Sequence, residues 1–184
     1  QGGNVKKILI YLLSIGIFGV ASIANSQTIR IGTEGAYPPW NNINSAGDLE
    51  GAEIDFGNEA CKRMGVTCEW VTQDWDGIIP ALLQGKYDII IAGMSITEER
   101  KEKVNFTTGY MTDGARFAVL KNSGLANLNI AGMAKVNLNN AGGKEQAAIG
   151  QLIAAMDGKT VCVQSSTIHQ NFLEKHMSGA VDVK

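Results

Sequence analysis

Three short apolar runs, separated by two amphipathic segments, occupy the sequence between residues 28 and 92. The first run, 28–33, alternates polar and apolar residues, and the second lies at 68–72. The third, 87–92, is nearly all apolar and rich in β-branched residues, which is typical of a strand buried on both faces. This order predicts a parallel sheet whose strands are joined by right-handed crossovers.

The two intervening segments have the spacing of helices. The first carries apolar or small residues from Ile54 to Met64 and stops at Gly65. The second begins after Asp74, which can cap it, and stops at Gly85. The region is therefore predicted to be a β-α-β-α-β unit.

Polar and aromatic side chains follow each predicted strand. Glu34 and Tyr37 follow the first, Trp75 the second, and Ser95 and Arg100 the third. Because ligands of open parallel sheets bind outside the carboxyl ends of the strands, these side chains are expected to converge. The pattern indicates a small-molecule binder.

The first 26 residues have the composition of a secretory signal peptide. Lys6 and Lys7 form a basic start, an apolar run covers 8–24, and small residues at 24–26 offer a cleavage site. A membrane anchor is the alternative, but the run is shorter than the roughly 20 apolar residues of a span. We expect cleavage and export to the periplasm, with 27–184 as the mature chain.

Charge excludes two classes of partner. Removing Lys6 and Lys7 takes the basic residues from 16 to 14 against 18 acidic ones, a net charge of −4. No basic stripe is present, so nucleic acid and anionic membrane surfaces are poor candidates.

The three cysteines are Cys61, Cys68 and Cys162. The first two bracket a predicted helix end and strand start, a corner that can bring two Cα atoms within bridging distance. In an oxidising compartment this predicts a disulfide, with two buried free thiols as the alternative. Cys162, in a strand-like run, is expected to be a small buried hydrophobe.

The pattern changes beyond residue 100. Strand candidates at 104–106 and 115–120 complete a first lobe, 27–120, and 121–124 has the composition of a linker. Residues 125–143 are rich in Asn, Ala and Gly, which favours a surface loop. Further elements are then expected in the order helix 144–156, strand 159–164, helix 167–176 and strand 180–183. They predict the N-terminal part of a second, incomplete α/β lobe, 125–184.

Several segments resemble, in order, the periplasmic amino-acid-binding proteins of ABC transporters. They are TEGAYPPW (33–40), CKRMGVTC (61–68), WDGIIPALLQGKYDIIIAGMSITEERK (75–101) and VCVQSST (161–167). The resemblance is to the octopine and nopaline binders and to the lysine, arginine, ornithine and histidine binders. It implies a monomer with a type II-like periplasmic-binding-protein fold, in which two mostly parallel α/β lobes close over an amino acid. The second lobe is expected to be truncated, and the implied partner is a permease in the inner membrane.

The resemblance also implies roles for residues of the first lobe. Arg100 matches the arginine that grips the α-carboxylate of the ligand bidentately, with Ser95 adding a donor. Gly93 and Met94 would present backbone groups to the ligand's ammonium. The alternative for Arg100 is a solvated helix charge.

Two aromatic residues and one acid complete the first lobe's part of the site. Tyr37 and Trp75 resemble the walls that sandwich the ligand's side chain, and Glu34 matches an acid that faces its distal cation. The alternatives are core packing for each aromatic ring and a solvated loop position for the acid.

From the second lobe, the resemblance adds Gln164, Ser166 and Thr167. Hydroxyl and amide groups at this helix start would complete the anion cradle. Many relatives have glycine where Ser166 stands.

Enzymatic signatures are missing. No Ser/His/Asp order or phosphate loop occurs, and His169 and His176 lie in no metal-binding motif, so neither metal nor cofactor is expected. Two rivals remain open because fold does not fix function: a periplasmic dehydratase for prephenate or arogenate, and the sensory domain of a receptor. The favoured prediction is a non-enzymatic binder of a basic amino acid or opine.

Overall fold

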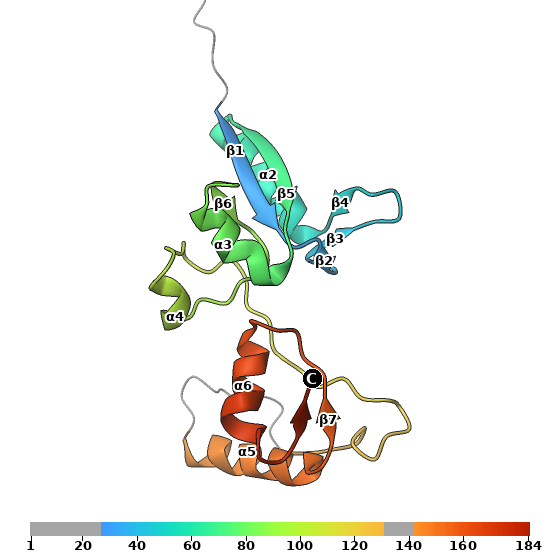
Figure 1. Cartoon of the computed structure of the whole chain (residues 1–184). Coiled ribbons are helices and arrows are strands. Elements are labelled where there is room, and N and C mark those ends of the chain that lie inside the picture. The colour runs from blue at the N-terminus through green and yellow to red at the C-terminus, as the bar shows by residue number, and fades with distance from the viewer. Residues whose placement is uncertain (1–26, 131–141) are drawn as a thin grey trace, which may run out of the picture.

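The structure, a computed structural model, describes residues 27–130 and 142–184. The predicted signal peptide and most of the Asn-rich loop lie outside the described residues. Figure 1 shows two groups of elements joined by an extended segment: an N-terminal group from β1 to α4, residues 28–101, and a C-terminal group from α5 to β8, residues 143–183. In the described part of the chain, no helix has the length and apolarity needed to cross a membrane.

The N-terminal group is built on a three-stranded parallel sheet of order β5-β1-β6. Its strands are β1 (Thr28–Thr33), β5 (Thr67–Thr72) and β6 (Ile89–Ile90), and its helices are α2 (Ala52–Met64), η1 (Trp75–Gly77), α3 (Ile78–Leu83) and α4 (Glu98–Lys101). The β1 and β5 strands pair over their full length, from Thr28 opposite Thr67 to Thr33 opposite Thr72. The predicted β-α-β-α-β order is confirmed.

Helix α2 covers one face of this sheet. Its Cys61 packs with Ile31 of β1 and with Ile91 in a buried cluster. A side chain at Gly57 would bring Cβ to 2.6 Å from the Trp70 ring, so the helix approaches the sheet closely only because this position is glycine. Gly65 ends α2 in the left-handed conformation, at φ 69°.

The predicted disulfide is confirmed. Cys61 near the end of α2 is bonded to Cys68 in β5, with the Cα atoms 6.0 Å apart. The bridge ties the helix to the strand that follows it.

Helix α3 packs on the opposite face. Ile78 and Ala81 of the helix form a buried cluster with Tyr87 and Ala92. The Tyr87 ring lies against Gly32, where a Cβ would sit 2.5 Å from the ring, and its hydroxyl donates to the Ile78 carbonyl. Burial raises the pKa of Tyr87.

A small antiparallel sheet, absent from the sequence prediction, follows β1. Its order is β2-β3-β4, formed by β2 (Ala36–Tyr37), β3 (Asn41–Ile43) and β4 (Leu49–Glu50). The Asn44 carboxamide oxygen accepts from the amides of Ala46 and Asp48 and so shapes the turn between β3 and β4. Strands of two or three residues carry too little periodicity to be recognised in a sequence.

The C-terminal group contains α5 (Gly143–Met156), β7 (Thr160–Val161), α6 (Ile168–Met177) and β8 (Asp182–Val183). The two strands are parallel neighbours. Its buried cluster is Met156, Val161, Leu173, Met177 and Val181. The predicted restart of the α/β order is therefore present.

Several sequence expectations about strands are wrong. Residues 104–106 and 115–120 form no strand, since no neighbouring strand within the described ranges lies beside them, and Leu120 is 75% exposed. The expected strand 87–92 is reduced to Ile89–Ile90 at the sheet edge, so Ile89 is exposed rather than covered on both faces. The strand 159–164 shortens to Thr160–Val161.

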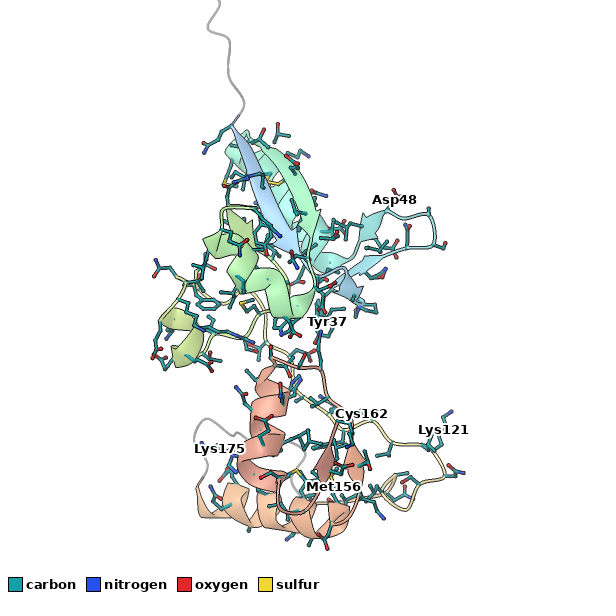
Figure 2. The ribbon with its side chains drawn as sticks, viewed as in Figure 1. Tyr37, Asp48, Lys121, Met156, Cys162 and Lys175 are labelled. Carbon is teal, nitrogen blue, oxygen red and sulfur yellow. A yellow bond between two sulfur atoms is a disulfide. The ribbon has the colours of Figure 1, made fainter. Side chains whose placement is uncertain are left out.

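Two further corrections concern single side chains. Asp74 precedes the η1 turn but makes no side-chain capping bond, because the chain enters a 3₁₀ turn there before α3 begins. Cys162 is exposed, since β7 ends at Val161 and the two-stranded sheet leaves the next residue uncovered (Figure 2). The lobe boundaries 27–120, 121–124 and 125–184 stay a prediction.

Candidate functional site

The carboxyl ends of the three parallel strands lie side by side and deliver the loops that carry the predicted site residues. The Gln73 amide donates to the Thr33 carbonyl at 2.9 Å, and the Ile91 amide donates to the Gly32 carbonyl at 3.0 Å. These bonds continue the sheet just beyond its last residues. They place the starts of the three loops at one edge, which faces the C-terminal group (Figure 1).

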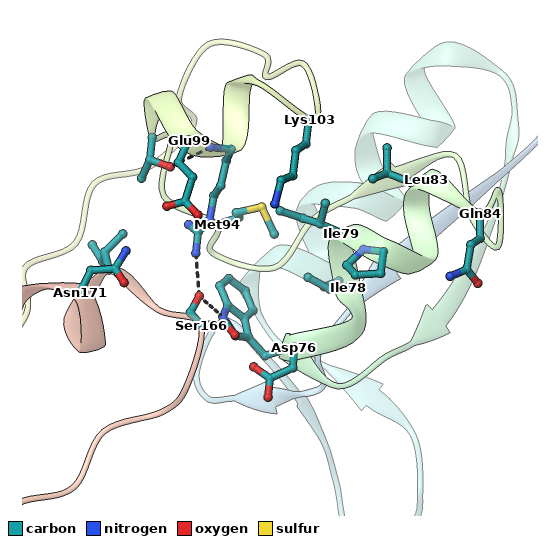
Figure 3. A pocket seen from close by; sticks show the side chains of 15 residues that line it. Asp76, Ile78, Ile79, Leu83, Gln84, Met94, Glu99, Lys103, Ser166 and Asn171 are labelled. Carbon is teal, nitrogen blue, oxygen red and sulfur yellow. Dashed lines mark hydrogen bonds between the residues drawn. The ribbon is translucent and has the colours of Figure 1, made fainter. Parts of the chain in front are cut away.

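Arg100 is held between the two groups of elements. Its Nη1 donates to the Ser95 carbonyl at 2.8 Å. Its Nη2 donates to the Ser166 carbonyl at 3.1 Å, and Figure 3 marks this second bond. Its own amide donates to the Thr97 hydroxyl, which caps α4. Burial lowers the pKa of Arg100, although a guanidinium stays charged throughout the physiological range. The geometry is that of an anchored, half-buried cation, not of a freely solvated helix charge.

Trp75 stands beside this guanidinium. The Arg100 Cζ atom lies 5.3 Å from the centre of the indole ring, within range of a cation–π contact. The indole N–H donates to the Ser166 carbonyl at 3.0 Å. One backbone carbonyl of the C-terminal group therefore accepts from two side chains of the N-terminal group.

Ser166 has an unusual backbone conformation. Its φ of 57° lies in the left-handed region, which glycine adopts more readily than serine. The resemblance implies a glycine in many relatives at this position, and this backbone conformation suits that expectation. The serine amide donates to the Gln170 side chain at 2.7 Å, which helps to hold the turn before α6.

Two further contacts join the groups. The Gln164 side chain donates to a Glu34 carboxylate oxygen at 2.6 Å. The Ser165 hydroxyl donates to Asp76, at 3.0 and 2.8 Å from its two oxygens. The sequence gives no sign that Ser165 and Asp76 are bonded. Nothing in a single sequence links two exposed residues so far apart in the chain.

Thr167, the third residue predicted from the C-terminal group, makes no hydrogen bond to the N-terminal group among those described. It is buried, its hydroxyl donates to the Gln164 carbonyl at 2.8 Å, and it caps α6 by accepting from the Gln170 amide. Both of these bonds stay within its own loop and helix, so the hydroxyl shapes the loop.

Tyr37 and Gly93 pack against each other on the other side of the site. Gly93 has φ 58°, and a side chain there would put Cβ at 3.0 Å from the Tyr37 ring. The Tyr37 hydroxyl donates to Asp113 at 3.4 Å. Burial and, secondarily, the Asp113 charge raise the pKa of Tyr37. Figure 2 places Tyr37 at the end of the N-terminal group that faces the C-terminal group.

A cavity of about 620 Å³ adjoins the contact between the groups. Of the predicted site residues, Trp75, Met94, Arg100 and Ser166 line it, and α3 adds an apolar wall that includes Ile79 (Figure 3). The remaining predicted residues, Glu34, Tyr37, Gly93, Ser95, Gln164 and Thr167, lie outside its lining. The described residues contain no cluster of three or more side chains suited to a metal ion.

Residues 29–179 match the sequence profile of a protein family, the bacterial extracellular solute-binding proteins, family 3. The chain belongs to this family. Its members are solute-binding proteins rather than enzymes, as the sequence predicts.

Individual members of family 3 share much of this sequence. The octopine-binding periplasmic protein of Rhizobium meliloti is 42% identical over 175 residues, which cover 94% of this chain and 59% of that protein. The L-arginine-binding protein of Pseudomonas aeruginosa is 40% identical over 120 residues, which cover 65% of this chain and 46% of that protein. The chain thus spans about half to three fifths of the length of these relatives.

A solved structure of the same fold is that of an ancestral amino acid-binding protein, described as a precursor of cyclohexadienyl dehydratase. It superposes with a TM-score of 0.65 at 32% identity, covering 86% of this chain and 60% of the other. The predicted α/β periplasmic-binding-protein fold with a parallel sheet is confirmed.

Proposed function

We propose that this family 3 protein captures a basic amino acid or an opine between two lobes, and delivers it to the permease of an ABC transporter in the inner membrane. A periplasmic relative that is named for octopine and a relative that is named for L-arginine support this proposal, as does the predicted signal peptide at 1–26. Arg100, anchored half-buried where the two groups of elements meet, is the observation that carries it.

The guanidinium of Arg100 is suited to exchange one partner for another. Nη1 is anchored by the Ser95 carbonyl of its own loop, whereas Nη2 donates to Ser166 across the boundary. A ligand carboxylate would replace that neutral carbonyl with an ionised acceptor, and such bonds are roughly twice as strong. Ser166 would keep its bond from the Trp75 indole. Carboxylate capture and contact with the second lobe would therefore take place on adjacent atoms.

The distal end of the ligand is proposed to lie toward Tyr37, Trp75 and Glu34. A guanidinium or ammonium resting on an aromatic face gains about 0.5 to 2 kcal/mol, and the Glu34 carboxylate can neutralise it. In the structure, Glu34 is already bonded to a donor, the Gln164 amide. A cationic ligand would compete with that amide and thereby sense the position of the second lobe.

A ligand series tests the proposal without any mutation. Thermal-shift and calorimetric titrations compare L-arginine and octopine with argininamide, which lacks the carboxylate, and with citrulline, which lacks the distal charge. Lysine, ornithine, histidine and nopaline extend the series. A ligand at 100 times its Kd stabilises the protein by about 2.7 kcal/mol, which a melting curve resolves.

The expected result is stabilisation by arginine or an opine, and weaker binding of both analogues. Equal binding of argininamide and arginine would contradict the carboxylate grip. Incubation with prephenate or arogenate is the matched test of the dehydratase alternative, because a binder returns these compounds unchanged.

A further inference from the structure

Glu53 is a buried carboxylate that the ligand-binding proposal does not use. It lies in the first turn of α2 and is only 2% exposed. Asp55, in the same turn, is exposed, so the favourable position at a helix start does not require burial. Burying a charge is costly unless hydrogen bonds replace the water that it loses. The Glu53 carboxylate therefore requires hydrogen-bond donors inside the protein.

Three donors surround the Glu53 carboxylate. The Asn41 side-chain amide donates to Oε2 at 2.6 Å, the Gly93 backbone amide donates to Oε1 at 2.7 Å, and the Tyr110 hydroxyl donates to the same Oε1. No ion pair to Glu53 forms among residues 27–130 and 142–184. Neutral donors therefore replace the lost hydration of the carboxylate. The carboxylate in turn fixes the orientation of each donor group.

These donors belong to three different segments that border the candidate site. Asn41 links Glu53 to the loop after β1, because its carboxamide oxygen accepts from the Gly35 amide at 2.8 Å. Gly35 lies between Glu34 and Tyr37 in the sequence. Gly93 opens the loop that leads to Arg100. Glu53 thus links the loop after β1 to the loop after β6.

The third donor, Tyr110, belongs to the extended segment that leads to the C-terminal group. Its ring stacks on Phe56 of α2 with the centres 5.2 Å apart. Burial, and secondarily the bond to Glu53, raises the pKa of Tyr110, so its hydroxyl stays a donor. Three residues on, Asp113 accepts from Tyr37. The same segment therefore touches both the carboxylate and the aromatic wall of the site.

The bond to Glu53 also decides which backbone group Gly93 can offer to a ligand. Its amide is committed to the carboxylate, and its Cα lies against the Tyr37 ring. The carbonyl is the polar group that remains, and a carbonyl accepts from an ammonium. A peptide flipped at this position would present a donor, which an ammonium cannot use.

We propose that Glu53 is a positioning residue for ligand capture, which fixes the loops at Gly35 and Gly93 and ties both to the segment that leads to the second lobe. This inference rests on the proposed function for its ligand, but the arrangement of bonds can be tested without one.

An exchange of the two polar groups provides the sharpest test. Glu53→Gln introduces an amide donor that must face another donor, either the Asn41 amide or the donors at Oε1. Asn41→Asp places a second carboxylate against that of Glu53. In the double variant, the new amide at 53 donates to the new carboxylate at 41, while Gly35, Gly93 and Tyr110 keep their acceptors. We expect each single variant to weaken binding of L-arginine and octopine about tenfold or more, and the double variant to return within about threefold of wild type. Single variants that bind like wild type, or a double variant no better than either, would overturn the proposal.

Tyr110→Phe keeps the ring stack on Phe56 and removes only the hydroxyl, so it remains informative even if Glu53→Gln fails to fold. It is expected to weaken binding about threefold to tenfold with little change in melting temperature. Asp55→Asn, in the same turn but exposed, is the matched control and should change neither quantity. Unaltered affinity in Tyr110→Phe would count against the link to the connecting segment.

Hydrogen exchange of the Gly93 amide in the ligand-free protein separates this inference from the proposed function. The amide should be protected in wild type, exposed to exchange in Glu53→Gln, and protected again in the double variant. If wild type binds none of the ligands, the proposed function fails, while the exchange data still decide the role of Glu53. Equal Gly93 protection in wild type and Glu53→Gln would overturn that role.

Discussion

The two groups of elements meet at the candidate site with different kinds of atoms. The N-terminal group contributes mainly side chains, among them Trp75, Arg100 and Glu34, and they stand on loops at the ends of paired parallel strands. The C-terminal group contributes the Ser166 carbonyl together with the Gln164 amide and the Ser165 hydroxyl of the same loop. The side chains of the N-terminal group thus lie on the larger, disulfide-bonded framework. Under the proposed function, opening and closing would break and remake the contacts made by the C-terminal group.

The largest expected effect concerns Arg100. Arg100→Ala should cost roughly 2 to 5 kcal/mol of arginine or octopine binding, measured by calorimetry, because it removes one partner of a desolvated charge pair. Arg100→Lys should also lose substantially, since a point charge cannot replace the planar fork. Arg63→Ala is the matched control, because Arg63 pairs with Glu59 on the exposed face of α2. Affinity near wild type for Arg100→Ala would contradict the proposal that the N-terminal group supplies the side chain that grips the ligand carboxylate.

The second prediction concerns the framework itself. Cys61→Ser should lower the free energy of unfolding of the N-terminal group by about 2 to 3 kcal/mol in chemical denaturation, given the short loop that the bridge closes. Cys162→Ser should change it by less than about 0.5 kcal/mol, since this thiol is exposed. Alkylation of the unreduced, denatured protein should modify Cys162 alone. Three modified cysteines would contradict the bridge.

A smaller effect is expected where the groups touch through exposed side chains. Ser165→Ala removes the bond to Asp76, and it should lower ligand affinity by no more than about tenfold, the equivalent of one ordinary hydrogen bond. Ser178→Ala, at the exposed end of α6, is the control. A loss as large as that of Arg100→Ala would show that the second group carries more of the binding than its contacts indicate.

The smallest effect is a dependence on pH within the N-terminal group. The Arg30 guanidinium and its backbone amide hold the pKa of Asp88 down at about 2. Because the folded pKa is depressed, the stabilisation is complete above the unfolded value near 4 and is lost as the pH falls toward 2. The stability difference between wild type and Asp88→Asn should therefore shrink over that window. A difference that persists unchanged at pH 2 would exclude this origin.

Much of the N-terminal group can be predicted from the sequence because its signals are local. Helical spacing up to Gly65, and cysteines placed on either side of that corner, indicate a helix, a strand and the bridge between them. Loops at the ends of neighbouring parallel strands must lie together, so the positions of Trp75 and Arg100 along the chain are enough to predict that they are neighbours.

The remaining features depend on partners that are distant in sequence. Glu53 has the appearance of an ordinary first-turn acid, and only the fold surrounds it with donors from Asn41, Gly93 and Tyr110. The residues around Cys162 resemble a strand and so predict burial, but burial requires a neighbouring element to cover the thiol. The roles of the individual site residues in holding a ligand stay predictions that the variants above test.

The junction at Ser166 has a consequence for how ligand preference can change. The oxygen that accepts hydrogen bonds from both Trp75 and Arg100 belongs to the main-chain carbonyl. It is therefore present whatever amino acid occupies position 166. Under the proposed function, the side chain at position 166 can change toward the ligand while the carbonyl keeps the contact between the groups, provided that the residue tolerates a φ of 57°. A saturation library at this position should accept glycine and asparagine and reject valine and isoleucine. In the proposed mechanism, ligand specificity would then depend on the side chain of this residue and closure on its carbonyl.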